Sequence, residues 1–299
     1  MPLLVARRGF SLVELLVALV VLGLAAGAIS GVLLTAGRTH RAASERVGLD
    51  QGLRAAATIL PPELRELDAA DSDITAMSPT SITVRAMRQL AFLCAGPDVG
   101  AGGPARLVVR QRPFFGARQS FTSGDSVLVY YEGDPALRSD DGWLRGEVTA
   151  VVNEDCPDPD QKRPGYRLTL GQRWSGWGAP AVPGSVTSGS PVRGFATVTY
   201  ALYQSPADNQ WYLGQRPAGG TIEPLAGPLT GPDGVTFRYR DSAGAVTTAP
   251  TAVREIEIHV RGRTARPVRA ASSGMVAYLV DSVVTRVALR NNPRCGPCQ

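Results

Sequence analysis

The sequence has 299 residues, which is enough for one large or two modest hydrophobic cores. Its net charge is +5, and the arginines that carry it are scattered rather than gathered in a block with aromatic residues, so no nucleic-acid partner is predicted. Hydrophobic residues make up 44% of the chain, but one segment near the N-terminus holds the only long apolar run, which argues against a protein that crosses the membrane several times.

That apolar run covers residues 10–35, FSLVELLVALVVLGLAAGAISGVLLT, in which Glu14 is the only charge. About 20 apolar residues can span a bilayer as a helix. A cleaved secretory signal has a shorter apolar stretch of about 7–15 residues before a small-x-small site. Three interpretations compete: a cleaved signal, a plain membrane anchor, and a leader that is removed just before the span. The length of the run predicts that residues 10–35 stay on the mature protein as a transmembrane helix.

Glu14 is unusual because an ionised carboxylate inside a membrane span costs about 2.5–3.5 kcal/mol near the bilayer centre. Such residues usually have a partner. The alternative is that Glu14, close to the start of the run, stays hydrated at the membrane edge.

The segment Arg7-Arg8-Gly9-Phe10-Ser11-Leu12-Val13-Glu14 and the apolar residues behind it closely resemble the class III signal of type IV pilins and type II secretion pseudopilins. The resemblance implies a leader at residues 1–9 and cleavage between Gly9 and Phe10 by a prepilin peptidase, which would also methylate the new amine of Phe10. It further implies a single-pass inner-membrane protein with a cytoplasmic N-terminus, a periplasmic head and a place in a cell-envelope filament. Arginine counts on the two sides of the span do not settle the orientation by themselves.

In a filament of this kind, Glu14 of one subunit can pair with the Phe10 amine of its neighbour, because opposite charges attract strongly in a low dielectric. Gly23, Gly27 and Gly31 recur every four residues and would line one face for close helix packing. The competing explanation is that glycine is simply common in membrane helices.

Residues 36–62 are expected to form the periplasmic half of the same helix. They are rich in alanine, and no proline occurs before Pro61. Because proline lacks a backbone donor and clashes with the preceding turn, Pro61-Pro62 predicts an end or a sharp kink, giving a helix from about Phe10 to Leu60. A short helical turn at residues 63–67 could follow.

Residues 63–299 are expected to form a β-rich head. Short alternating or β-branched runs divided by Gly, Pro, Asp and Asn predict an antiparallel sheet, so the fold class is α+β. The predicted strands are 81–85, 106–110, 126–131, 147–152, 197–203, 210–213, 235–240, 254–261 and 276–289. Residues 95–105, 153–166 and 171–194 are expected to be loops.

The C-terminal half resembles the W-type minor pilins and the J-type type II secretion pseudopilins. The matching pieces occur in order at 198–202, 211–216, 223–226, 235–244, 253–260 and 287–291. This resemblance implies contacts with other minor pilins and the major pilin, and with inner-membrane lipid before assembly. Residues 95–195 match none of these pieces and are expected to be an insertion that enlarges the head.

The four cysteines, Cys94, Cys156, Cys295 and Cys298, suit an oxidising compartment and allow three pairings. Cys295-Gly-Pro-Cys298 is also the redox motif of thioredoxins, so a membrane-anchored thiol-disulfide oxidoreductase is the alternative function. Such enzymes place the first cysteine at a helix N-terminus. Here the sequence printed beyond Cys298 is too short for a helix, which favours a disulfide staple, with Cys94 and Cys156 as the other bridge.

An acidic loop offers the one weak metal candidate. Glu154, Asp155, Asp158 and Asp160 could supply hard oxygen ligands to calcium, but their spacing matches no EF-hand, and a solvated loop is favoured.

The two histidines, His40 and His259, have no neighbouring ligand set in the sequence, and no nucleophile elbow or phosphate-binding loop is present. The sequence therefore predicts a non-enzymatic protein without a cofactor.

Overall fold

The computed structural model describes residues 11–98, 104–116, 118–134, 136, 141–157, 163–171, 186–269 and 275–290. The chain forms two compact units. One comprises α1 up to Gln51 together with Arg263–Val280, and the other comprises Gly52–Gly262 together with the residues from Asp281 onward. The expected α+β fold, with one long apolar N-terminal helix and a large antiparallel sheet, is confirmed.

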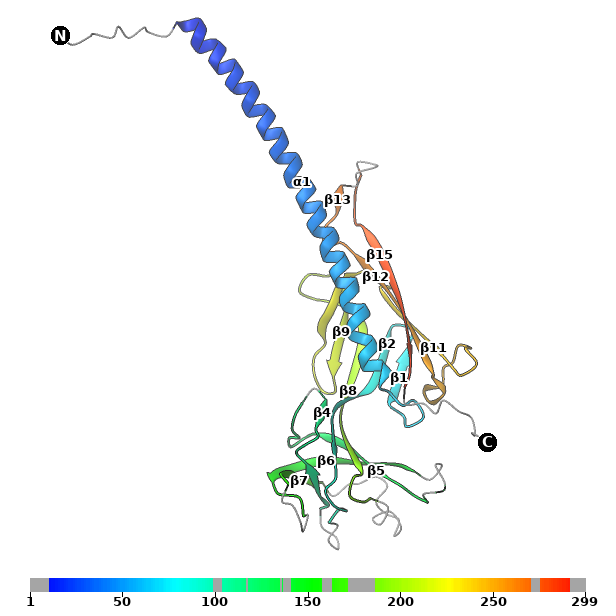
Figure 1. Ribbon diagram of the computed structural model, residues 1–299. Coiled ribbons are helices and arrows are strands. Elements are labelled where there is room, and N and C mark those ends of the chain that lie inside the picture. Colours follow the sequence, from blue (N-terminus) through cyan, green and yellow to red (C-terminus); the bar gives the residue numbers. More distant parts are fainter. Residues whose placement is uncertain are drawn as a thin grey trace, which may run out of the picture. The chain divides into compact units, whose positions relative to one another are not determined.

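Helix α1 runs unbroken from Leu12 to Arg65 (Figure 1). Its last turns carry Leu53, Leu60 and Leu64 on one face, and all three are buried, as expected for leucines at helical spacing. Gly52 lies on the same helix, where an added Cβ would be 3.0 Å from the carbonyl oxygen of Gly227. A glycine there allows the helix backbone to approach the sheet closely.

The prediction that the helix ends at Leu60 is wrong, because Pro61 and Pro62 lie inside α1. Each proline removes one backbone hydrogen bond, and an interior proline costs about 3 kcal/mol or more. Burial offsets this cost, since Leu60 and Leu64 on either side of the prolines are fully buried. The carboxylate of Glu63 also accepts a 2.8 Å hydrogen bond from Arg88, which holds the last turn against β2.

The main sheet contains thirteen strands within the described residues. They are β1 (Ile74–Ser78), β2 (Ser81–Phe92), β3 (Arg106–Arg110), β4 (Phe115–Gly116), β5 (Ser126–Tyr131), β6 (Gly142–Asn153), β7 (Gly165–Leu170), β8 (Pro191–Gln204), β9 (Trp211–Pro217), β10 (Glu223–Leu229), β11 (Val235–Arg240), β12 (Glu255–Arg263) and β15 (Val280–Ala288). The strand order is β11-β12-β10-β9-β8-β5-β6-β7-β3, with β2 paired to β8, β1 and β4, and β15 paired to β12. A separate ribbon pairs β13 (Val268–Arg269) with β14 (Val276–Ala277).

Strand β8 connects two groups of strands. Its first part pairs with β5, its second part pairs with β9, and β2 pairs with it along most of its length. Figure 1 shows β5, β6 and β7 grouped together and β9, β11 and β12 in another group, with β8 between them. One long strand pair therefore belongs to both halves of the head.

The strands β3, β5, β6 and β7 enclose a hydrophobic core together with parts of β2 and β8. Its centre includes Leu107, Val127, Leu144 and Leu168, each at most 1% exposed. Phe121 closes this core in an edge-on contact with Phe114, with ring centroids 5.4 Å apart. The region expected to enlarge the head, residues 95–195, thus supplies five strands and a packed interior.

The strand predictions for β3, β5 and β11 agree with the structure at both ends. Strands β1, β4, β7, β10 and β13 were not predicted, and the expected loops at 153–166 and 171–194 overlap the starts of β7 and β8. Strand β10 was missed because it contains Pro224 and Pro228, which do not donate to a ladder. Its pairing with β9 shifts register beside both prolines.

Candidate membrane anchor and assembly site

The first half of α1 is apolar on every side. From Leu12 to Leu34 its large apolar side chains are between 55% and 78% exposed, so none of them is covered by the rest of the chain. It is the one helix in the described part of the chain that is long and apolar enough to cross a membrane, by length and composition. A helix that is apolar all round suits lipid as its surroundings.

Glu14 takes part in a capping box at the start of α1. Its carboxylate accepts a 3.4 Å hydrogen bond from the backbone N–H of Ser11, and its own N–H donates to the Ser11 hydroxyl at 3.2 Å. These two bonds satisfy donors that a helix N-terminus otherwise leaves free. From the sequence, Glu14 is interpreted as a charge, either hydrated at the membrane edge or paired with the Phe10 amine of a neighbour, and the capping box that its Ser-x-x-Glu spacing indicates is missed.

The structure places Gly23, Gly27 and Gly31 on α1, and no other segment among the described residues packs against them. A Cβ added at any of these glycines would meet no atom within 4 Å. The fold of a single chain therefore does not require glycine here, and a packing role would depend on a neighbouring helix. Gly9 and Phe10 lie outside the described residues.

Cys94 and Cys156 form a disulfide with Cα atoms 5.4 Å apart. It links the segment after β2 to the segment after β6 and closes a loop of 62 residues in sequence separation. The pairing is one of the three that four cysteines allow. Cys295 and Cys298 lie outside the described residues, so the expected disulfide between them stays a prediction.

The described part of the acidic loop is engaged in a protein contact. Glu154 forms an ion pair with Arg167 at 2.7 Å. No group of three or more potential metal ligands occurs among the described residues, and Asp158 and Asp160 fall outside them. Within the described residues, no contact supports calcium binding by this loop.

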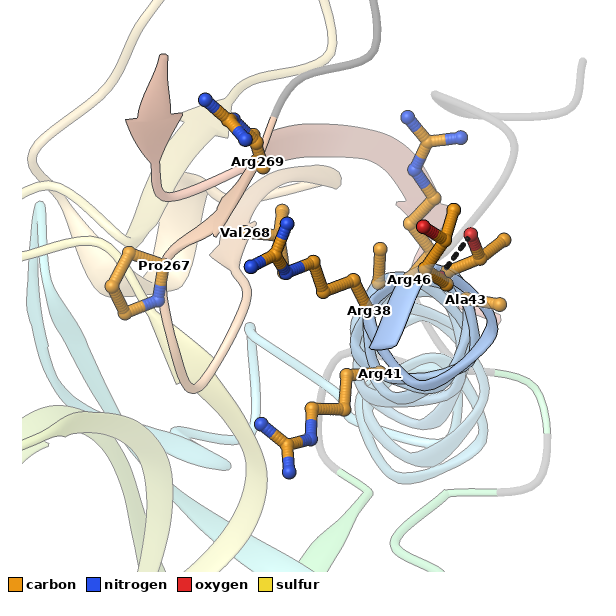
Figure 2. Close-up of a pocket in the computed structure, with 10 residues that line it drawn as sticks. Arg38, Arg41, Ala43, Arg46, Pro267, Val268 and Arg269 are labelled. Atoms are coloured by element: carbon orange, nitrogen blue, oxygen red, sulfur yellow. Dashed lines mark hydrogen bonds between the residues drawn. The ribbon is translucent and has the colours of Figure 1, made fainter. Parts of the chain in front are cut away.

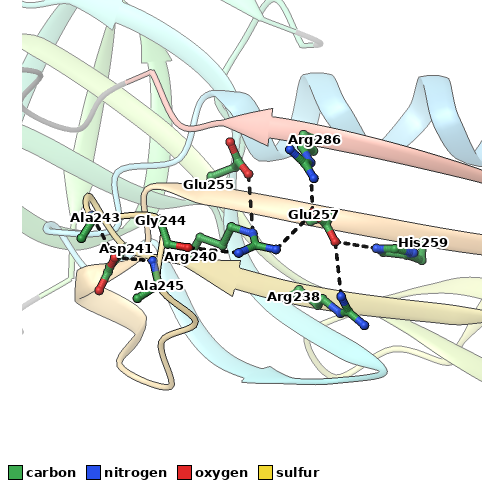
Figure 3. A network of polar contacts seen from close by, with 10 residues as sticks. All are labelled: Arg238, Arg240, Asp241, Ala243, Gly244, Ala245, Glu255, Glu257, His259 and Arg286. Atoms are coloured by element: carbon green, nitrogen blue, oxygen red, sulfur yellow. Dashed lines mark hydrogen bonds and ion pairs between the residues drawn. The ribbon is translucent and has the colours of Figure 1, made fainter.

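A buried carboxylate joins three strands on the outer face of the sheet (Figure 3). Glu257 on β12 is 3% exposed, and its oxygens contact His259 at 2.6 Å and Arg286 of β15 at 3.0 Å. Arg240 and Arg238 of β11 lie 3.4 and 3.8 Å away. The hydrogen bond with His259, together with the charges of Arg286 and Arg240, holds the pKa of Glu257 below its ordinary value. His259 thus has a structural partner, and this network ties β11 and β15 to β12.

A second polar network fixes the end of α1. Glu63 and Arg88 form their ion pair beside Tyr200 of β8, and burial raises the pKa of that tyrosine to about 12. The hydroxyl of Tyr200 therefore stays protonated at neutral pH. The network orients the helix end that carries the head.

Comparison with known proteins identifies one feature. The family model described as the prokaryotic N-terminal methylation motif matches residues 5–30. No curated protein and no solved structure matches the chain. The chain thus has a type IV prepilin-like N-terminus, which supports a pilin-like structural subunit anchored in the inner membrane by a single span. Such a motif implies processing by a prepilin peptidase and assembly with other pilins.

Proposed function

We propose that this protein is a minor pilin or pseudopilin, of the W or J type, that joins the tip-proximal complex priming a type IV pilus or a type II secretion pseudopilus. The observation that carries the proposal is the methylation motif at residues 5–30, followed directly by a helix that is apolar and exposed on every side. The family resemblance of the C-terminal half supports the minor-pilin subtype.

The assembly pair in this proposal is Phe10 and Glu14. Cleavage after Gly9 gives Phe10 a free α-amine, and Glu14 lies in the first turn of α1. A carboxylate and an amine from adjacent subunits would neutralise each other in surroundings where each alone is costly. Pairing would draw the incoming helix out of lipid and set its axial register.

The presence of Glu14 also suggests a position in the filament. In systems of this type the subunit at the extreme tip often lacks the acid, having no subunit above it to pair with. A chain that keeps the acid would lie below the tip. A periplasmic head is supported by the Cys94–Cys156 disulfide, because such bonds persist in oxidising compartments.

The capping box allows the pairing hypothesis to be tested against a purely structural role of Glu14. Glu14→Gln removes the charge but keeps a side chain that can complete a capping box. Ser11→Ala removes the cap and keeps the charge. We expect Glu14→Gln to lower recovery of partner pilins with the tagged chain by about a hundredfold or more, since leaving a buried charge unpaired costs about 3–5 kcal/mol. Ser11→Ala should assemble nearly normally.

The measurement is co-purification of partner pilins from membranes and sheared filaments, with membrane fractionation of each variant as the control for insertion. Both variants should remain in the membrane fraction. Normal assembly of Glu14→Gln, or equal loss in Ser11→Ala, would contradict the proposed pairing.

A further inference from the structure

A pocket of about 800 Å³ lies beside α1 just beyond the apolar span. One wall is the α1 surface from Thr35 to Arg46, and the other is Pro267, Val268 and Arg269. All of these residues belong to the same compact unit. Figure 2 shows Arg38 and Arg41 extending from α1 on the side where Pro267, Val268 and Arg269 lie.

The pocket is strongly basic. Arg38, Arg41, Arg46 and Arg269 line it, and no acidic side chain is among its lining residues. No ion pair involves Arg38, Arg41 or Arg46 within the described part of the chain. The nearby carboxylate of Glu45 accepts a 3.0 Å hydrogen bond from the backbone N–H of Arg266. Like charges gathered around one hollow repel one another, and a bound anion would relieve that repulsion.

The position of the pocket along α1 matches the headgroup layer of a bilayer. With a rise of 1.5 Å per residue, Arg38 follows Leu34, the last large apolar residue of the span, by about 6 Å. The polar layer on each side of a bilayer is about 5–8 Å thick. A pocket that opens at Thr35 and Arg38 therefore lies at the level of lipid phosphates.

The segment around β14, which pairs with β13, also has the residue types of a membrane interface. Met275, Val276 and Tyr278 expose 68%, 66% and 44% of their surfaces. The guanidinium of Arg263 stacks on the Tyr278 ring at 4.7 Å. Exposed apolar residues beside tyrosine and arginine are typical of surfaces that rest at the boundary between headgroups and acyl chains.

We propose that this pocket binds the phosphate of an anionic phospholipid headgroup before the subunit leaves the membrane. Arg38 and Arg41 from α1 and Arg269 from β13 hold the phosphate, because guanidinium groups match its oxygens with paired N–H donors. Met275 and Val276 rest against the acyl chains. The site fixes the depth of the helix in the bilayer and is separate from the Phe10 and Glu14 pair.

The test uses the full chain in neutral detergent with equimolar phosphatidylglycerol and phosphatidylcholine, followed by native mass spectrometry of retained lipid. We expect the wild-type chain to retain phosphatidylglycerol preferentially. The triple variant R38Q/R41Q/R269Q should weaken phosphatidylglycerol binding at least tenfold, given a contribution of about fivefold per arginine near an anionic surface. Binding of phosphatidylcholine should not change.

The matched control is R54Q/R112Q/R216Q, which removes the same charge from three exposed arginines outside the pocket. It should keep wild-type lipid preference, and far-UV circular dichroism should show that both variants remain folded.

Equal loss in both triple variants would overturn the proposal, because it would show a non-specific charge effect. Displacement of the lipid by inorganic phosphate at about 10 mM, roughly a hundredfold excess over an anion site with a Kd of about 0.1 mM, would assign the pocket to soluble phosphate instead. Unchanged lipid binding with lost co-purification of partner pilins would assign it to another subunit and overturn the lipid site.

Discussion

The two ends of α1 are both rich in leucine, yet they occupy opposite environments. Leu22 and Leu24, near the start, are 66% and 72% exposed, whereas Leu60 and Leu64, near the end, are fully buried. In the first half large apolar residues occupy every side of the helix, so no polar face is left for water. In the last turns they recur every three or four residues, so one face packs on the sheet and the other is polar.

This difference shows how one continuous helix can have one half suited to lipid and the other half packed on a protein core. The first half gains nothing from the fold of its own chain and depends on lipid or on neighbouring helices. The last turns are part of the head and are held by burial and by the ion pair of Glu63 with Arg88. Substitutions at the two ends should therefore affect different properties of the protein.

The largest contrast is expected between Leu64→Ala and Leu24→Ala. Leu64→Ala should lower the free energy of unfolding of the head by about 2–5 kcal/mol, because it removes a fully buried side chain and leaves a cavity. Leu24→Ala should leave it unchanged within about 0.5 kcal/mol, because that leucine is 72% exposed. Urea unfolding of the full chain in detergent, followed by the fluorescence of its four tryptophans, measures both. Equal losses would refute the division of α1.

A smaller effect is expected from acid on the outer face of the sheet. The pKa of Glu257 is lowered in the folded state, so its contribution to stability is fully present above the unfolded pKa of about 4.3 and is lost as the pH falls through the folded value. The groups facing it are the imidazole of His259 and the guanidinium groups of Arg238, Arg240 and Arg286.

Glu257→Gln should therefore cost about 1 kcal/mol at pH 7 and less at an acidic pH below the lowered folded-state pKa of Glu257, where the wild-type carboxyl is protonated in both states. Glu255→Gln is the matched control, since Glu255 is 35% exposed and meets Arg240 only at 3.9 Å. Chemical denaturation at the two pH values gives both differences. A cost of Glu257→Gln that does not depend on pH would contradict the assignment.

Much of the fold can be predicted from the sequence, because local residue patterns indicate which segments form strands and which faces are buried. The alternation of Ile256, Ile258 and Val260 correctly indicates the inward face of β12, and all three are buried. The pattern fails where tertiary contacts override local rules, as in the helix that passes through Pro61 and Pro62 and the strand β10 that includes two prolines.

The sites divide in the same way. The motif around Glu14 is contiguous, so it can be recognised in the sequence. The capping box of Glu14 with Ser11 is contiguous as well and can be recognised in the same way. The basic pocket could not be foreseen, because Arg269 lies far along the chain from Arg38 and Arg41 and only folding brings them to one hollow. The ion pair of Glu257 with Arg286 likewise joins residues of two different strands.

The smallest expected effect tests whether the exposed half of α1 has a specific packing face. Gly27→Leu adds a large side chain where an added Cβ would meet no described atom within 4 Å beyond its own turn of α1, so head stability should not change. If the glycine face packs against a neighbouring helix, recovery of partner pilins should fall about threefold, which corresponds to a typical interhelical contribution of about 0.6 kcal/mol. Ala25→Leu adds a similar side chain on roughly the opposite face of α1 and should assemble normally. Equal recovery of the two variants would mean that the glycines reflect membrane-helix composition, and a greater loss with Ala25→Leu would place the packing face on the other side of the helix.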